Sequence, residues 1–155
     1  MNGNNICAEV NIVGDCVSGI FNTSLKQEIN EVLNTAARIS SLIDVMNYKF
    51  EKNNIEQIEV GIGLSYGRAL MIKAGYNGSS INDLVWMGEV VNEASELASY
   101  GNQTHSDKET MVSDIFYGNL NEHNQELLVR NYSRNCYNGH IIWTEMNEWY
   151  RENCE

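Results

Sequence analysis

Short apolar runs separated by turn residues open the chain. Residues 7–13 and 16–21 are mostly apolar and meet at Gly14-Asp15. Gly and Asp are common turn residues, so this pattern predicts two strands joined by a tight hairpin. A carboxylate at the tip of an apolar hairpin is also suited to hold a metal ion, because hard cations prefer oxygen ligands. The local pattern favours the turn interpretation and leaves the metal interpretation open.

A helical period follows the hairpin. Apolar residues recur at three- and four-residue steps over residues 23–52, which predicts an amphipathic helix. These positions are Leu25, Ile29, Val32, Ala36, Ile39, Ile43, Met46 and Phe50. Ser24 and Gln27 have the spacing of a capping box at its start, and Asn53-Asn54 are expected to end it. We assign the stripe to the protein core rather than to a membrane or a partner helix.

The middle of the chain predicts strands and a second helix. Residues 58–67 and 68–76 are predicted as strands around Tyr66-Gly67, followed by a loop at residues 77–80. Gly61 and Gly63 weaken the first strand unless another backbone or a ligand comes close. A helix is predicted over residues 88–101, with Gly101 as its C-terminal cap.

The last third of the chain contains shorter elements. Residues 110–117 are predicted as a strand and its end, and residues 121–131 as a short helix. Asn138-Gly139 is a hairpin signal before a last strand. We expect Trp143, Trp149 and Tyr150 to be packing residues. Strands and helices mix without strict alternation, so the expected fold class is α+β, with one sheet covered by helices.

Composition narrows the function. At 155 residues the chain has the length of a single domain, residues 1–155. Its 10 basic and 21 acidic residues give a net charge of −11, which argues against a sequence-independent nucleic-acid binder. A metal ion and a few local cations can still hold a small anionic ligand. No run of 18 apolar residues predicts a transmembrane helix. The four cysteines form no C-x-x-C pair, so we expect free thiols in a reducing cytoplasm.

Three motifs stand in a fixed order. They are Gly14-Asp15 after an apolar strand, Gly61-Ile62-Gly63 with Gly67, and Gly88-Glu89-Val90-Val91-Asn92-Glu93-Ala94 at a helix start. Together they resemble the class III nucleotidyl cyclase catalytic domain, from about residue 6 to residue 116. That family has a ferredoxin-like sheet covered by helices.

A narrower resemblance is to the bacterial uridylate cyclases of Pycsar anti-phage defence, which make cyclic pyrimidine nucleotides, chiefly cyclic UMP. It implies a cytoplasmic lyase that converts UTP to a second messenger for a separate effector gated by that cyclic nucleotide. It also implies a homodimer, because the family's active sites lie between two protomers. One protomer gives the metal carboxylates, and the other gives the base and ribose contacts.

The family chemistry is attack of the ribose 3′-hydroxyl on the α-phosphate, with two Mg²⁺ or Mn²⁺ ions in each active site. Asp15 matches the second of two metal-binding carboxylates, which favours the metal interpretation of the hairpin. The first carboxylate lies upstream in the family, and this chain begins just before the hairpin. We therefore expect an N-terminally truncated domain without its first strand and helices, or a degenerate cyclase. The short chain is expected to have little activity by itself.

Two further positions depart from the family. Asn92 matches the asparagine that orients the ribose, but Glu96 occupies the position of the transition-state arginine. A carboxylate cannot stabilise developing phosphate charge, so Arg68 or Lys73 is a candidate replacement, and both can equally be ordinary solvated cations. The family's late lysine is also absent, and only His140 lies in that region.

The base-reading positions of the family correspond to Asn11 and Val85. Asn11 carries an acceptor and two donors, which suit the edge of uracil, and Val85 has no polar group. The alternative role of Asn11 is that of a strand residue whose side chain hydrogen-bonds the backbone. Two other functions stay open: a catalytically dead cyclase-homology binding module, and an adenylate or guanylate cyclase with an unusual base pocket.

Overall fold

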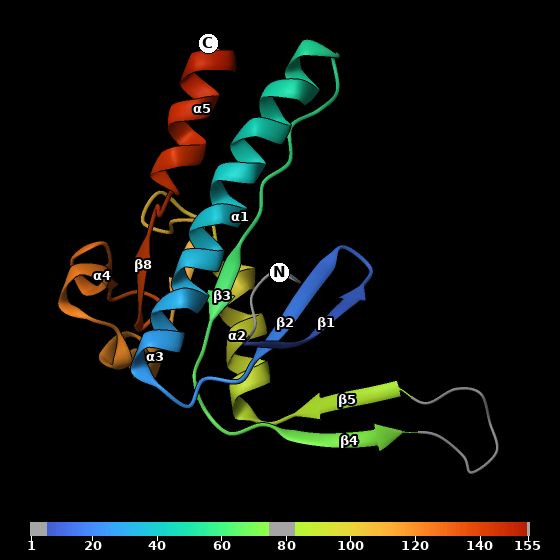
Figure 1. The fold of residues 1–155 in the computed structure, drawn as a ribbon, viewed down its shortest axis with the longest axis vertical. Helices are drawn as coiled ribbons and strands as arrows, with labels where there is room; N and C mark the ends of the chain where they lie inside the picture. Colours follow the sequence, from blue (N-terminus) through green and yellow to red (C-terminus); the bar gives the residue numbers. More distant parts are fainter. Residues whose placement is uncertain (1–5, 75–82, 155) are drawn as a thin grey trace. The chain divides into compact units, whose positions relative to one another are not determined.

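The computed structural model describes residues 6–74 and 83–154, and its elements are drawn in Figure 1. The chain divides into two compact units. Unit 1 comprises Met1–Ile58, Asn119–Leu127 and Ile141–Glu155, and unit 2 comprises Glu59–Gly118 and Leu128–His140. The loop predicted at residues 77–80 lies outside the described residues.

Unit 1 begins with the predicted hairpin. Strands β1 (Cys7–Val13) and β2 (Cys16–Phe21) pair antiparallel, from Cys7 opposite Phe21 to Val13 opposite Cys16. Gly14 has a φ of +62°, a left-handed conformation that favours glycine. The hairpin prediction is therefore confirmed with its bounds.

Helix α1 (Lys26–Lys52) confirms the predicted long helix, but its start differs. The Leu25 N–H donates to Glu28 Oε2 at 2.7 Å, so the Ser24–Gln27 capping box is wrong by one residue. The carboxylate of Glu28 is the better acceptor, because charge-assisted hydrogen bonds are stronger than neutral ones.

The buried face of α1 contains much of the predicted stripe. Ile29, Val32 and Ala36 are buried as expected, whereas Leu25 is exposed. The other buried apolar residues of the helix are Leu33, Ala37 and Val45. The helix ends at Asn53, as predicted.

Helix α5 (Thr144–Cys154) lies beside α1 (Figure 1). The Trp143 N–H donates to Ser41 Oγ at 2.8 Å, and the rings of Tyr48 and Tyr150 meet edge to face with centroids 5.7 Å apart. Tyr150 is therefore a packing residue, as predicted. The prediction is wrong for Trp149, whose side chain is 49% exposed. Helix α4 (Glu122–Glu126) also belongs to unit 1 and confirms the first half of the short helix predicted over residues 121–131. The second half of that prediction is wrong, because Val129–Asn131 form strand β7.

The last strand predicted after Asn138-Gly139 is wrong. These residues end strand β8 (Cys136–Gly139), and the turn before this strand contains Asn135 at a φ of +54°. Asn138 is buried and its side-chain amide donates to the Ser106 carbonyl at 2.7 Å. Its side chain therefore holds the loop that carries Ser106 and the buried Asp107 instead of making a turn.

Unit 2 contains a four-stranded sheet of order β3-β6-β8-β7, in which only β3 and β6 are parallel. The remaining strands of this sheet are β3 (Ile62–Leu64), β6 (Thr110–Val112) and β7 (Val129–Asn131). Helix α2 (Glu89–Tyr100) packs on β3 and β6, and helix α3 (Asp114–Asn119) follows β6. Leu97, Met111 and Cys136 form a buried cluster between helix and sheet.

A separate antiparallel hairpin completes unit 2. It joins β4 (Leu70–Ala74) and β5 (Asp83–Met87), and β5 was not predicted. The two strands predicted around Tyr66-Gly67 therefore exist but do not pair with each other. The α+β class is confirmed, although the described strands form three sheets rather than one.

Candidate functional site

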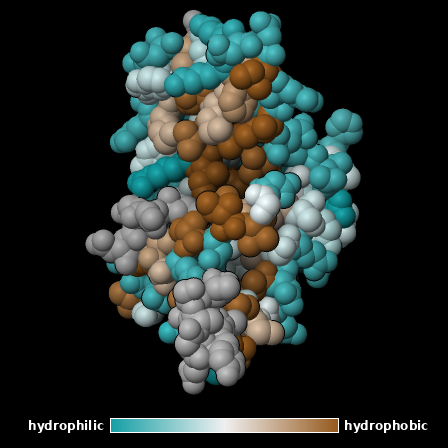
Figure 2. Space-filling model, turned by 90° about the vertical axis from the view of Figure 1, so that its right-hand side faces the viewer, coloured by the Kyte–Doolittle hydropathy of each residue, from teal (hydrophilic) through white to brown (hydrophobic). Residues whose placement is uncertain are grey.

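Asp15 lies at the tip of the β1–β2 hairpin, as predicted, and its side chain is exposed. It has no ion-pair partner among the described residues, so its carboxylate remains available to a cation. Ile12 and Val13 beside it are 73% and 75% exposed, and apolar side chains are visible on the surface drawn in Figure 2. Within residues 6–74 and 83–154, no three His, Cys, Asp or Glu side chains gather into a metal-binding group. Asp15 is thus a single exposed carboxylate, the type of oxygen ligand that hard divalent cations prefer.

Asn11 lies on β1 in the same hairpin and is half-buried. It pairs with Ser18, and two residues further on Val13 pairs with Cys16. Because strand side chains alternate, Asn11 points to the same face of the hairpin as Val13, next to the turn. One short hairpin therefore carries both the candidate base reader and the candidate metal ligand.

Asn92 lies in the first turn of α2 and is exposed. Its backbone N–H donates to the Gly88 carbonyl at 3.3 Å. Gly88 has a φ of +145°, and a Cβ placed on it would lie 3.0 Å from the Arg68 carbonyl oxygen. The structure therefore brings the backbone of Arg68 against the start of the helix that carries Asn92. Arg68 lies in the loop before β4, not on the strand as predicted.

Gly61 and Gly63 fix the position of α2. A Cβ on Gly61 would lie 2.0 Å from the Ala98 carbonyl oxygen, and one on Gly63 would lie 2.0 Å from that of Ala94. The predicted close approach of another backbone is confirmed, and that backbone is α2. This glycine motif sets how Asn92 is presented, because it seats the helix directly on β3.

Lys73 and Val85 lie on opposite faces of the β4–β5 hairpin. Val85 pairs with Ile72, whereas Lys73 pairs with Leu84. Directly opposite residues of an antiparallel pair share a face, and neighbours along a strand do not. The two candidates are thus on neighbouring strands, but one face of this hairpin cannot present both.

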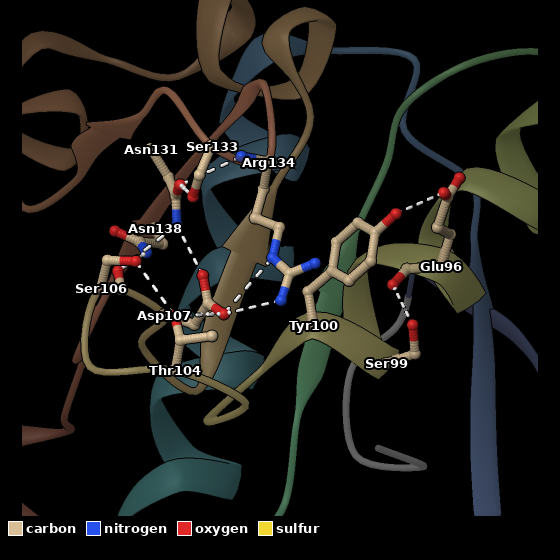
Figure 3. A network of polar contacts seen from close by, with 10 residues as sticks. All are labelled: Glu96, Ser99, Tyr100, Thr104, Ser106, Asp107, Asn131, Ser133, Arg134 and Asn138. Carbon is tan, nitrogen blue, oxygen red and sulfur yellow. Dashed lines mark hydrogen bonds and ion pairs between the residues drawn. The ribbon is translucent and has the colours of Figure 1, made fainter.

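Glu96, at the position of the family arginine, belongs to a polar network (Figure 3). The Tyr100 hydroxyl donates to Glu96 Oε1 at 2.5 Å. The Arg134 guanidinium carbon lies 4.3 Å from the centroid of the Tyr100 ring, and Arg134 Nη2 lies 3.1 Å from Asp107 Oδ2. Arg134 is therefore committed to this network and is not available as a replacement arginine.

Asp107 is the buried anchor of the network, and its side chain is 0% exposed. Burial by itself raises the pKa of its carboxyl, but hydrogen bonds from Arg134, Thr104 and Asn131 outweigh burial, so the pKa lies below its ordinary value of 3.8. Sequence reasoning missed Asp107 and Arg134. No local pattern could have found them, because they are 27 residues apart and neither belongs to a motif.

The other cationic side chains of unit 2 differ in whether they have an ion-pair partner. His140 Nδ1 lies 2.6 Å from Glu109 Oε1, and Arg130 pairs with Asp114. The candidates Arg68 and Lys73, like the exposed Lys108, have no ion-pair partner among the described residues, which keeps them available for an anionic ligand.

Comparison with known proteins gives two kinds of match. Residues 1–135 match the family described as Adenylate and Guanylate cyclase catalytic domain. A uridylate cyclase of Treponema porcinum is 39% identical over 145 residues, which cover 91% of this chain and 50% of the relative. A uridylate cyclase of Gulbenkiania mobilis is 34% identical over 164 residues, which cover 95% of this chain and 64% of the relative.

The chain thus spans half of the first relative and less than two thirds of the second. No solved structure matches it. Among the described residues, no helix has the length and apolar character needed to span a membrane.

Proposed function

The chain belongs to the adenylate and guanylate cyclase catalytic domain family, and we propose that it forms the catalytic domain of a uridylate cyclase. The reaction converts UTP to 3′,5′-cyclic UMP and pyrophosphate. The observation that carries the proposal is the similarity to two proteins named uridylate cyclase, which extends over 91% and 95% of this chain.

In this reaction the ribose 3′-oxygen forms a bond to the α-phosphorus. The bond between that phosphorus and the oxygen leading to the β-phosphate breaks, and pyrophosphate leaves. Asp15 would hold Mg²⁺ or Mn²⁺, and such a cation, when bound, neutralises charge on the phosphates. The exposure of Asp15 and its lack of an ion-pair partner among the described residues support this role.

Asn92 and Arg68 would act on the ribose and phosphates. The Asn92 side chain is exposed in the first turn of α2, where its amide can hydrogen-bond a ribose oxygen. We prefer Arg68 over Lys73 as the cation for developing phosphate charge. Arg68 adjoins the start of the same helix, whereas Lys73 points away from the face of the hairpin that carries Val85.

Asn11 and Val85 would select the base. The Asn11 amide can donate to a uracil carbonyl and accept from N3–H, and Val85 would contact the base without a hydrogen bond. A polar site rejects a base that leaves its groups unpaired, since an unmatched buried polar group costs about 1–3 kcal/mol.

The proposal includes the cellular setting expected for this activity. The protein would be a cytoplasmic homodimer of the Pycsar defence type, and cyclic UMP would act on a separate effector. Exposed apolar side chains on both hairpins, including Val13 at 75% and Leu70 at 62%, support an interface with a second copy.

One observation favours a second candidate function. Glu96 replaces the family arginine with a carboxylate, which suits a cyclase-homology module that binds a nucleotide without turning it over. Asp15, Asn11 and Asn92 argue against a purely structural relic, which would need none of them, and measurement of turnover separates the enzyme from the binding module.

The test is competition among the four nucleoside triphosphates in the full-length protein with Mg²⁺ or Mn²⁺. We expect UTP to be cyclised preferentially, with pyrophosphate formed in equal amount. Asp15→Asn should lower kcat/KM by about 100-fold or more, as expected for lost stabilisation of transition-state charge.

Asp44→Asn is the matched control, since it removes the same charge from α1. Preference for ATP or GTP would contradict the substrate assignment and favour a purine cyclase. Binding of UTP without cyclic product would favour the binding module.

A further inference from the structure

Glu96 presents an electrostatic problem for the proposed function, on which this inference rests. Glu96 follows Asn92 by four residues on α2, and both side chains are exposed. Residues at this spacing lie on the same face of a helix, with Cβ atoms about 5–6 Å apart. A carboxylate beside the group that orients the ribose would repel the nucleotide's phosphates.

The geometry of α2 makes this repulsion worse unless Glu96 is restrained. Helical side chains lean toward the N-terminus of their helix, which would direct a free Glu96 toward Asn92. In the structure the carboxylate is instead bonded to Tyr100, one turn further toward the C-terminus, at 2.5 Å. The bond to Glu96 raises the pKa of Tyr100, and a phenol with the ordinary pKa of about 10 is already a donor at neutral pH.

Tyr100 is itself held from two sides. Its ring packs against the buried cluster that includes Leu97 and Met111. The Arg134 guanidinium also lies against the ring, with its carbon 4.3 Å from the ring centroid (Figure 3). Aromatic rings attract cations placed over their faces.

Arg134 is in turn fixed to the buried carboxylate of Asp107. Its Nε and Nη2 atoms lie 3.3 Å and 3.1 Å from Asp107 Oδ2. Asp107 also accepts from Thr104 at 2.8 Å and from Asn131 at 2.9 Å. A continuous chain of contacts therefore runs from the buried Asp107 to the exposed carboxylate of Glu96.

We propose that Tyr100 is a positioning residue that holds the Glu96 carboxylate toward the C-terminus of α2 and away from the phosphates of the bound nucleotide. Arg134 and Asp107 set the orientation of the Tyr100 ring. The substitution of the family arginine by a glutamate is thereby made compatible with binding of a triphosphate.

The test is a double-mutant cycle of Tyr100→Phe and Glu96→Gln in the full-length protein. Tyr100→Phe keeps the ring and its packing and removes only the hydroxyl. We expect it to raise the KM for UTP, and the Kd for 3′-deoxy-UTP, about 3- to 10-fold at low salt, the size of a coulombic effect at a partly solvated surface. In the Glu96→Gln background the same substitution should have no effect.

Salt dependence separates repulsion from damage to the fold. Salt screens repulsion between exposed charges, so the defect of Tyr100→Phe should shrink as salt is raised toward 0.5 M, a condition chosen because the screening length is then only about 4 Å. Tyr132→Phe is the matched control, since it removes the same hydroxyl from a side chain that is 88% exposed.

The outcomes are distinct. An unchanged affinity in Tyr100→Phe, or an equal loss in both backgrounds, would overturn the positioning role while leaving the cyclase proposal intact. The protein could also bind 3′-deoxy-UTP with the expected pattern and yet form no cyclic nucleotide from UTP. That result would support the positioning role of Tyr100 and overturn the proposed cyclase activity.

Discussion

At the scale of single residues, the best-defined polar group of this protein is Asp107. Its side chain is fully buried, and the structure gives it hydrogen bonds from Arg134, Thr104 and Asn131. A buried charge is tolerated only when it is paired and hydrogen-bonded. Removal of one partner from a buried pair typically costs about 3–5 kcal/mol. The fold of unit 2 therefore depends on a contact that also orients Tyr100.

This burial has a consequence for stability against acid. Because the pKa of Asp107 is lowered in the folded state, its contribution to stability is present above the unfolded pKa of about 3.9 and is lost as the pH falls through the folded value. We expect the free energy of unfolding, measured with urea from pH 6 to pH 3, to fall less steeply in Asp107→Asn than in the unsubstituted protein.

The exposed Glu122 of α4 offers a control. Glu122→Gln should leave the pH dependence of unfolding close to that of the unsubstituted protein. Equal slopes for Asp107→Asn and the unsubstituted protein would show that the Asp107 carboxyl has the same pKa in both states.

At the scale of elements, the seat of α2 on β3 decides where Asn92 is presented. Gly63→Ala would bring a methyl group to 2.0 Å from the Ala94 carbonyl oxygen, and a backbone atom cannot move aside as a flexible side chain can. We expect Gly63→Ala to destabilise the protein by about 1–3 kcal/mol or more, as overpacking does, measured as a fall in the urea midpoint.

Gly118→Ala is the matched control. This glycine lies in α3, and a Cβ placed on it meets nothing within 4 Å. Alanine is favoured over glycine in helices by about 1 kcal/mol, so Gly118→Ala should be neutral or stabilising. A Gly63→Ala protein as stable as Gly118→Ala would mean that α2 does not sit on β3 in this way.

Local patterns predicted the elements whose partners are near in sequence. The β1–β2 hairpin was predicted correctly because apolar strands flank Gly14-Asp15, and α1 because its period continues over seven turns. The pairing of β3 with β6 could not be predicted, since Ile62 pairs with Thr110, far along the chain. The hairpin turn predicted at Asn138-Gly139 was wrong because the dipeptide pattern does not show that Asn138 is buried within a strand.

The candidate site follows the same rule. The resemblance gave Asp15, Asn11 and Asn92, and the structure adds only their placement. Register was needed to separate Lys73 from Val85, because their opposite faces follow from the partners Leu84 and Ile72. The link from Glu96 to Tyr100 has helical i,i+4 spacing and was accessible to sequence reasoning. The links to Arg134 and Asp107 exist only in three dimensions.

At the scale of the whole molecule, the proposed function requires that an acidic protein with a net charge of −11 attracts a triphosphate. Long-range attraction cannot serve this purpose, so local cations and a bound divalent ion have to supply the favourable charge. Arg68, Lys73 and the exposed Lys108 have no ion-pair partner among the described residues of unit 2, and the first two are the candidates for the phosphates. The exposed apolar side chains on the hairpins are compatible with the second copy that the proposed function requires.

A composite site makes a definite prediction for mixed dimers. If one protomer gives Asp15 and the other gives Asn92, Asp15→Asn and Asn92→Ala should each be nearly inactive alone in the full-length protein. After the two variants are mixed and exchange subunits, half of the dimers are mixed, and each mixed dimer has one site with both defects and one intact site. Cyclic nucleotide formation should then return to about one quarter of the unsubstituted rate, measured after equilibration at a concentration where light scattering reports a dimer. Recovery at that level requires that subunits exchange and that each site is built from both protomers. A site built within one protomer would keep its defect in every dimer. A mixture that stays inactive although exchange is complete would place both residues in a site built by a single protomer.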